Sequence, residues 1–115
     1  MNIFQKIVAL LQLRQAIKKA DEAHAKTRER YYVIPSTDSS RRPKVVVLDR
    51  KNFRILKHKG YISAKASVRH LIQECFYFTP YANGDGYIDA KACDIKQRQY
   101  LAWYQAMLRL KKAKK

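Results

Sequence analysis

Closely spaced basic residues are the part of this chain whose side chains are best suited to binding chemistry. Arginine and lysine carry positive charge and donate hydrogen bonds to phosphate oxygens, so a surface lined by them can hold a nucleic-acid backbone. One group falls in the middle of the chain, and the other ends it, where no acidic residue follows Asp94. The residues that we expect to contact nucleic acid are Arg41, Arg42, Arg50, Lys51, Arg54, Lys57, Lys59, Lys111, Lys112, Lys114 and Lys115.

The charge balance of the whole chain indicates the same chemistry. The 115 residues include 25 lysines and arginines against 9 aspartates and glutamates, which gives a formal net charge of +16. A polyanion would neutralise this excess, and the release of its counterions would favour the complex. Nucleic acid is the first expected partner, either DNA or RNA bound without sequence preference, followed by an anionic membrane and an acidic protein. A solvated face, or a place inside a large nucleoprotein assembly, would account for the same charge.

Two further features could read bases or stack on them. A helix from Arg50 to Lys59 and a second one after Ser67 would form a helix-turn-helix, whose second helix enters the major groove. Ordinary helix packing is the preferred interpretation, because the connection is long and offers few base readers, namely Arg69, His70 and Gln73. Exposed aromatic rings beside the basic surface would permit base stacking, although core positions are the commoner place for such rings. The candidates for stacking are Tyr31, Tyr32, Tyr61 and Tyr81.

The sequence predicts no catalytic, metal or cofactor site. Residues 83–89 (NGDGYID) imitate the middle of a calcium-binding loop, but Tyr81 and Ala92 stand where its first carboxylate and its final glutamate are needed. The histidines lie in unrelated segments, and the acidic residues form no cluster for a catalytic metal. Cys75 and Cys93 belong to no C-x-x-C pair and are expected to be buried thiols. We therefore expect a binding protein without enzymatic activity.

Hydrophobic periodicity and turn residues predict the elements that must position these side chains. Apolar residues at spacings of three and four predict helices, β-branched and aromatic runs predict strands, and Pro and Gly mark the ends. The expected fold class is α+β, with about four helices and one β-hairpin in a single small domain. The helices are expected at 2–27, 50–59, 67 to about 80 and 89–111, and the strands at 31–34 and 44–48.

The N-terminal amphipathic helix forms a unit of its own, residues 1–28, ahead of an α+β core of residues 29–110 and a basic tail of residues 111–115. Its first half is the more apolar, so we expect that half to pack and the second half to project or lie along the surface. The apolar residues could instead cover a partner, and Ile3, Phe4, Ile7 and Leu11 are the residues expected there. A membrane is the less expected partner, since the run is too short and polar to span one.

Four runs of the sequence resemble one family of proteins: YYVIP at 31–35, VLDRKNF at 47–53, KGYIS at 59–63 and ECFYFTPY at 74–81. The family consists of small basic proteins encoded by phages of the Bacteroidales, and the resemblance covers most of the chain after Lys18. It implies attachment to the viral genome or a minor structural or adaptor part of the virion, and it transfers no functional residue. Because residues 3–13 lack the pattern of a signal peptide, we expect the host cytoplasm or the virion as the location, not secretion.

Overall fold

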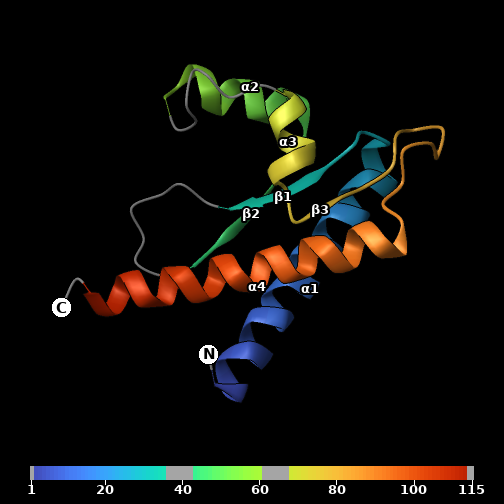
Figure 1. The fold of residues 1–115 in the computed structure, drawn as a ribbon. Helices are drawn as coiled ribbons and strands as arrows, with labels where there is room; N and C mark the ends of the chain where they lie inside the picture. Colours follow the sequence, from blue (N-terminus) through green and yellow to red (C-terminus); the bar gives the residue numbers. More distant parts are fainter. Residues whose placement is uncertain (1, 36–42, 61–67, 114–115) are drawn as a thin grey trace.

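The computed structural model describes residues 2–35, 43–60 and 68–113, and it confirms the α+β class (Figure 1). Four helices and three short strands occupy these ranges in one small domain. In chain order they are α1 (Ile3–Thr27), β1 (Tyr32–Pro35), β2 (Val45–Leu48), α2 (Arg50–His58), α3 (Val68–Glu74), β3 (Tyr77–Phe78) and α4 (Ala90–Ala113).

The strands form one antiparallel sheet in the order β2-β1-β3. The expected hairpin pairs β1 with β2, so that Tyr32 lies opposite Leu48 and Pro35 opposite Val45. β-Branched residues make up most of β2, which is the composition that favours a half-buried strand. The hairpin therefore follows the prediction from the sequence.

The third strand, β3, differs from the prediction that a helix continues to about residue 80. α3 ends at Glu74, and the Cys75 N–H still donates to the Leu71 carbonyl at 2.9 Å, but from Phe76 onward the backbone bonds to β1. The backbone N–H of Phe76 donates to the Val33 carbonyl at 2.7 Å, and that of Thr79 donates to the Tyr31 carbonyl at 2.9 Å. Pairing with an existing strand satisfies these backbone groups, and aromatic residues suit a sheet better than a helix. The helix start predicted at Ser67 lies outside the described residues.

The sheet is the middle layer of three. Val33 points to the side covered by α1 and α4, whereas its neighbour Tyr32 points to the side covered by α2 and α3. Val47 and Leu48 alternate in the same way on β2. Figure 1 shows α2 and α3 on one side of the strands and α1 and α4 on the other. The period of two along each strand thus builds two separate hydrophobic cores.

The contact between α1 and α4 holds one of these layers together. The buried residues of α1 are Ala9, Leu13, Ala16 and Ala20, which share one face of the helix. Three of them are alanine, and they form one core with Val33 of β1 and with Tyr100 and Tyr104 of α4. The Tyr100 hydroxyl of α4 donates to the Ala9 carbonyl at 2.6 Å, although that carbonyl already lies within a helix.

The expectation that the first half of α1 packs holds for one face only, through Ala9 and Leu13. Ile3 is 70% exposed and Phe4 76% exposed, and Ile7 and Leu11 are also exposed. These residues point away from the buried alanine face, which packs against the sheet and α4. The second half of α1 is the better anchored one, since Asp21 accepts a hydrogen bond from the Tyr77 hydroxyl at 2.7 Å.

Candidate nucleic-acid interface

A cleft of about 670 Å³ lies where the end of α1, the start of α2 and the turn after β3 meet. Three arginines, Arg28, Arg30 and Arg50, line it together with Tyr81. The hairpin positions them, because Arg28 and Arg30 directly precede β1 and Arg50 directly follows β2. Pairing of the two strands therefore brings residues about twenty positions apart to one place.

Arg30 is the fixed member of the cleft. Its side chain is buried, and its guanidinium donates to the Gly86 carbonyl at 2.7 Å. The guanidinium carbon lies 4.5 Å from the ring centre of Phe78 and 4.2 Å from that of Tyr81, within the range of cation–π attraction. The Nε of Arg30 is buried and has no hydrogen-bond partner among the described residues. Two rings and a carbonyl thus hold a charged side chain whose donors are not all used.

Arg50 approaches the same tyrosine from α2. Its guanidinium carbon lies 5.8 Å from the ring centre of Tyr81, and it donates a long hydrogen bond of 3.4 Å to the Tyr81 hydroxyl. The neighbouring Tyr32 hydroxyl raises the pKa of the Arg50 guanidinium, although no hydrogen bond of good geometry joins the two groups. Because Arg50 is exposed and remains charged at any physiological pH, its free donors face solvent.

The charges in the cleft are poorly balanced. Glu29 and Asp85 also line it, but neither forms an ion pair with the arginines in the described ranges. Asp85 is engaged within its own turn, where its carboxylate accepts from the Asn83 side chain at 3.0 Å. Over residues 2–35, 43–60 and 68–113, the single ion pair is Arg98 with Asp94, on the exposed side of α4. The cleft thus presents cations that a bound anion could neutralise.

The basic residues predicted on α2 extend this surface. Arg50, Lys51 and Arg54 are exposed and follow one another along the outer side of the helix, while Phe53 faces the core. Lys57 is half-buried, and Lys59 is exposed just after the helix end. Asp49 caps the helix by accepting the Asn52 backbone N–H at 2.8 Å, which fixes the direction of this row.

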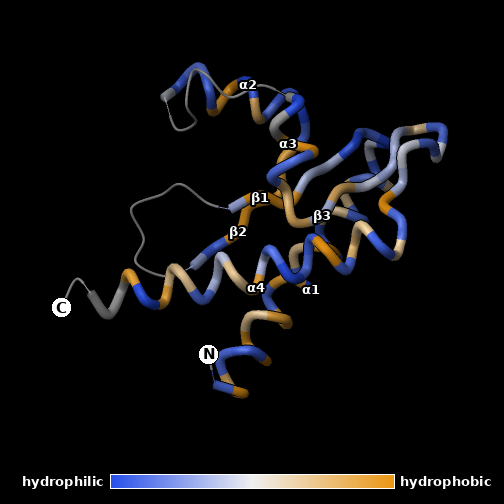
Figure 2. The backbone as a smooth tube through the Cα atoms, in the orientation of Figure 1, coloured by the Kyte–Doolittle hydropathy of each residue, from blue (hydrophilic) through white to orange (hydrophobic). Residues whose placement is uncertain are grey.

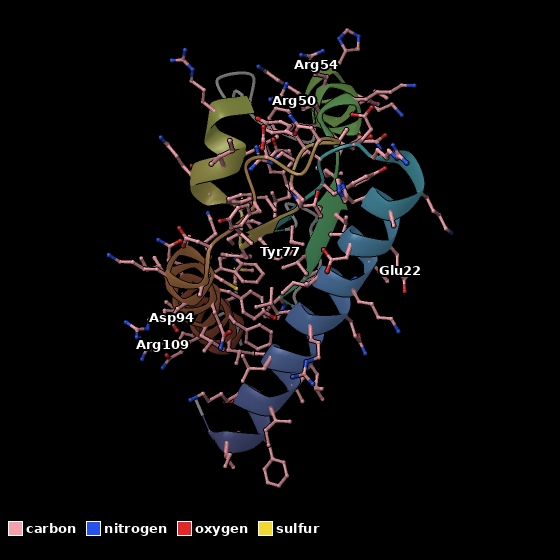
Figure 3. The ribbon with its side chains drawn as sticks, turned by 90° about the vertical axis from the view of Figure 1, so that its right-hand side faces the viewer. Glu22, Arg50, Arg54, Tyr77, Asp94 and Arg109 are labelled. Carbon is pink, nitrogen blue, oxygen red and sulfur yellow. The ribbon has the colours of Figure 1, made fainter. Side chains whose placement is uncertain are left out.

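The structure does not bring every predicted site residue to the arginine cleft and the outer side of α2. Arg41, Arg42, Lys114 and Lys115 lie outside the described residues. Lys111 and Lys112 belong to the last turn of α4, with only their backbone described. The end of α4 lies well away from α2 in Figure 1. Figure 3 likewise places Arg109 of α4 far from Arg50 and Arg54. Arg109 and the described end of α4 therefore lie apart from the α2 arginines.

The sequence did not single out Arg28 and Arg30. Arg28 is the C-cap of α1, and its φ of 61° is the left-handed conformation that glycine adopts most easily. A side chain there costs roughly 1 kcal/mol, but the sequence alone does not reveal this φ. Arg30 could not be found either, because its burial depends on Phe78 and Tyr81, which are remote in the sequence.

The features that could read bases are only partly present. Tyr32 is fully buried and Tyr31 is half-buried, whereas Tyr81 is 38% exposed but is flanked by Arg30 and Arg50. Tyr61 lies outside the described residues. On α3, Arg69 and Gln73 are exposed and the side chain of His70 is not described. The described part of α3 spans 7 residues, and its exposed polar side chains are few. The described residues thus offer more side chains for contact with phosphates than for contact with bases.

The buried Lys96 has a structural role. Its ammonium donates to the carbonyls of Ile72 at 2.7 Å and Cys75 at 2.8 Å, at the C-terminal end of α3. Such carbonyls have no partner within their own helix, so the lysine closes the helix end. Burial raises the pKa of the Cys75 thiol, and the nearby Lys96 only partly offsets that rise. Cys75 is buried as expected, but Cys93 is only half-buried.

The turn that resembles a calcium loop is held by its own hydrogen bonds. The backbone N–H of Tyr81 donates to the Asp85 carbonyl, and that of Gly84 donates back to the Tyr81 carbonyl, both at 2.9 Å. Gly86 has a φ of 70°, and a Cβ at this position would lie 3.0 Å from the Tyr81 ring. Within the described segments, no three histidine, cysteine or acidic side chains gather into a possible metal site.

In the same described segments, neither long helix carries a stretch apolar enough to cross a bilayer. Comparison with models of protein families, with curated proteins and with solved structures gives no match for this chain.

Proposed function

We propose that the protein binds nucleic acid, without catalysing a reaction, through phosphate contacts made by the arginine cleft and the outer face of α2. One observation carries the proposal. The guanidinium groups of Arg30 and Arg50 meet at the ring of Tyr81, and no acidic side chain among the described residues pairs with either. Two like charges held beside one ring repel each other, so a bound anion would lower the electrostatic energy of the cleft.

Rigid positioning makes such a cleft more effective than flexible surface lysines. Arg30 is locked by its contacts with Gly86 and two rings, so little side-chain entropy remains to be lost on binding. Arginine also presents a planar fork of donors that matches phosphate oxygens. The net charge of +16 would add long-range attraction to a polyanion. The resemblance to phage-encoded proteins is consistent with a viral genome as the ligand.

The proposal is tested by fluorescence-anisotropy titration of labelled single- and double-stranded DNA and RNA across a salt series. The slope of log affinity against log salt concentration counts the phosphates that the protein neutralises. The test variant is Arg50→Gln with Arg54→Gln. Its control is Arg98→Gln with Arg109→Gln, which removes equal charge from exposed positions on α4.

We expect the α2 variant to bind at least about tenfold more weakly and with a shallower salt slope, because each lost phosphate contact contributes roughly 1.5–3 kcal/mol. The α4 control should change affinity much less. Equal losses in both variants would mean that bulk charge alone drives binding, and the cleft would be rejected as the site. Absence of binding to all four nucleic acids near 0.15 M salt would overturn the proposed function itself.

A truncation after Leu110 tests whether the basic tail contributes to binding in addition to the cleft. It removes Lys111, Lys112, Lys114 and Lys115, which the sequence places among the binding residues. If the tail adds phosphate contacts, the salt slope becomes shallower while the effect of the α2 variant persists. An unchanged slope would remove these lysines from the site.

A further inference from the structure

The N-terminal end of α1 is an exposed apolar surface with no described element packed over it. Its members are Ile3, Phe4, Ile7, Val8 and Leu11, and exposure is greatest at the helix start, where Phe4 is 76% exposed. Figure 2 shows hydrophobic segments in this end of α1, which projects from the body beyond α4. An apolar group of this kind on a small protein usually marks a contact site.

Charge is distributed along α1 in a way that narrows the choice of partner. The charged residues from Asn2 to Ala20 are Lys6, Arg14, Lys18 and Lys19, all basic, and the first acidic residue is Asp21. At 1.5 Å per residue, Arg14 lies about 16 Å and Lys18 about 22 Å along the axis from Ile3. The apolar residues therefore occupy the end of the helix, and most of the cations stand behind them.

This arrangement disfavours a second helix as the partner. Helices that pair side by side need an apolar stripe along much of their length, whereas the exposed stripe of α1 ends at Leu11. On the same side of the helix, the following turns present Arg14, Gln15 and Lys18. A second copy of the chain would also bring a second set of cations against the first. Like charge therefore opposes self-association through this end.

A bilayer with anionic headgroups matches both features. Helices that lie in or enter a membrane interface combine bulky apolar residues, which reach the acyl boundary, with lysine and arginine at the level of the headgroup phosphates. A helix end with apolar residues all around its free side needs no shaped groove to receive it. Basic residues near the membrane also gain from the negative surface potential of such lipids.

We propose that the N-terminal end of α1 docks on an anionic lipid bilayer. Ile3, Phe4, Ile7 and Leu11 enter the boundary between headgroups and acyl chains, and Lys6 and Arg14 contact lipid phosphates. This surface lies at the opposite end of the molecule from α2 in Figure 1, so it is independent of the arginine cleft. Failure of the proposed nucleic-acid binding would leave this inference untouched, and the converse also holds.

Cosedimentation of the full chain with vesicles tests the proposal. The vesicles are phosphatidylcholine with about 30 mol % phosphatidylserine, a fraction that gives a negative surface potential, and phosphatidylcholine alone. The test variant is Ile3→Ser with Phe4→Ser. The control is Ile95→Ser with Leu110→Ser, which replaces two exposed apolar residues on α4 (46% and 55% exposed). Neither variant touches the core, so both should fold, as circular dichroism will show.

We expect binding to the anionic vesicles, little binding to the neutral ones, and a loss of at least about tenfold in the test variant, since it removes apolar surface that becomes buried. The control variant should bind like the original chain. A Phe4→Trp variant should show a blue shift in emission on vesicle binding that the unaltered chain, with Trp103 alone, does not show.

Three results would overturn the proposal. The first is equal vesicle binding by the test variant and the original chain, because charge alone would then explain it. The second is no binding to anionic vesicles, which would leave the end of α1 to a protein partner such as another virion component. The third is a dimer by light scattering that Ile3→Ser with Phe4→Ser converts to a monomer, which would assign this surface to a second copy of the chain.

Discussion

The two ends of α1 show how differently one helix can be used. The helix has 25 residues and is about 37 Å long. Its C-terminal end passes into the arginine cleft, where the charged Arg30 is buried between aromatic rings. Its N-terminal end carries bulky apolar residues such as Phe4, and they are exposed. Residue type alone would have predicted the reverse, so burial here depends on where neighbouring elements cover the helix.

The two ends also differ in how firmly they are held. The C-terminal half is tied to β3 through Asp21 and Tyr77, and the residues after it are tied to the turn at Gly86 through Arg30. The N-terminal half has its own capping box, in which Asn2 and Gln5 bond to each other's backbone, the hydrogen bond from Tyr100 to Ala9, and the buried side chains of Ala9 and Leu13. We therefore expect mutations at the C-terminal end to lower stability more than mutations at the N-terminal end.

The largest expected difference is between Arg30→Ala and Phe4→Ala. The first removes a charged hydrogen bond to the Gly86 carbonyl and two cation–π contacts, so we expect the free energy of unfolding to fall by about 2–3 kcal/mol. The second should change it by less than about 0.5 kcal/mol, because the Phe4 ring is exposed. Urea unfolding followed by circular dichroism measures both. Similar losses in the two variants would refute the contrast between the ends.

A smaller effect is expected at the contact that anchors the second half of α1. Tyr77→Phe removes the hydrogen bond to Asp21 and should lower the free energy of unfolding by about 1 kcal/mol at neutral pH. Asp21→Asn is the partner control, because it keeps an acceptor and should cost less. A neutral result for Tyr77→Phe would mean that packing alone holds this half of the helix.

The Tyr77 hydroxyl also predicts that the free energy of unfolding depends on pH. Burial, and then the bond to Asp21, raises the pKa of the Tyr77 hydroxyl, and burial also raises the pKa of Tyr100. In the unfolded chain a tyrosine loses its proton near a pH of about 10, while the folded protein still retains it. The stabilisation is thus complete below that pH and is lost as the pH rises further. Urea unfolding across this range should show a shallower decline in Tyr77→Phe, and an unchanged decline would contradict the assignment.

The smallest expected effect is the coupling between the two ends. Combining Ile3→Ser and Phe4→Ser with Arg50→Gln and Arg54→Gln should give the sum of the separate changes in unfolding free energy, within about 0.5 kcal/mol, because the sites share no partner. In vesicle cosedimentation, Ile3→Ser with Phe4→Ser should weaken binding by the same factor whether or not Arg50→Gln and Arg54→Gln are present. Coupling clearly above this value would show that α1 transmits a change from one end to the other.

Much of the architecture was predictable because it rests on local signals. The spacing of apolar residues predicted the helices, and α2 begins at Arg50 as expected. The β-branched run of β2 and the aromatic run of β1 predicted the hairpin. β3 was missed, since its two residues become a strand only through pairing with β1.

The candidate site was predictable only in part, for the same reason. Basic side chains must lie at the surface unless they find special partners, so exposed Arg50, Lys51 and Arg54 followed from composition and helix periodicity. Arg30 and Lys96 found such partners in remote rings and carbonyls, and their burial could not be inferred from nearby residues.

The sequence by itself determined the α+β class, the hairpin, the positions of the long helices and the strong positive charge, because each depends on residues close together in the chain or on composition alone. The tertiary structure decided which face of α1 is covered, which arginines meet at Tyr81, and that the ends of α2 and α4 lie apart. These outcomes depend on the crossing of α1 with α4 and on strand pairing, and both join residues that are far apart in the sequence.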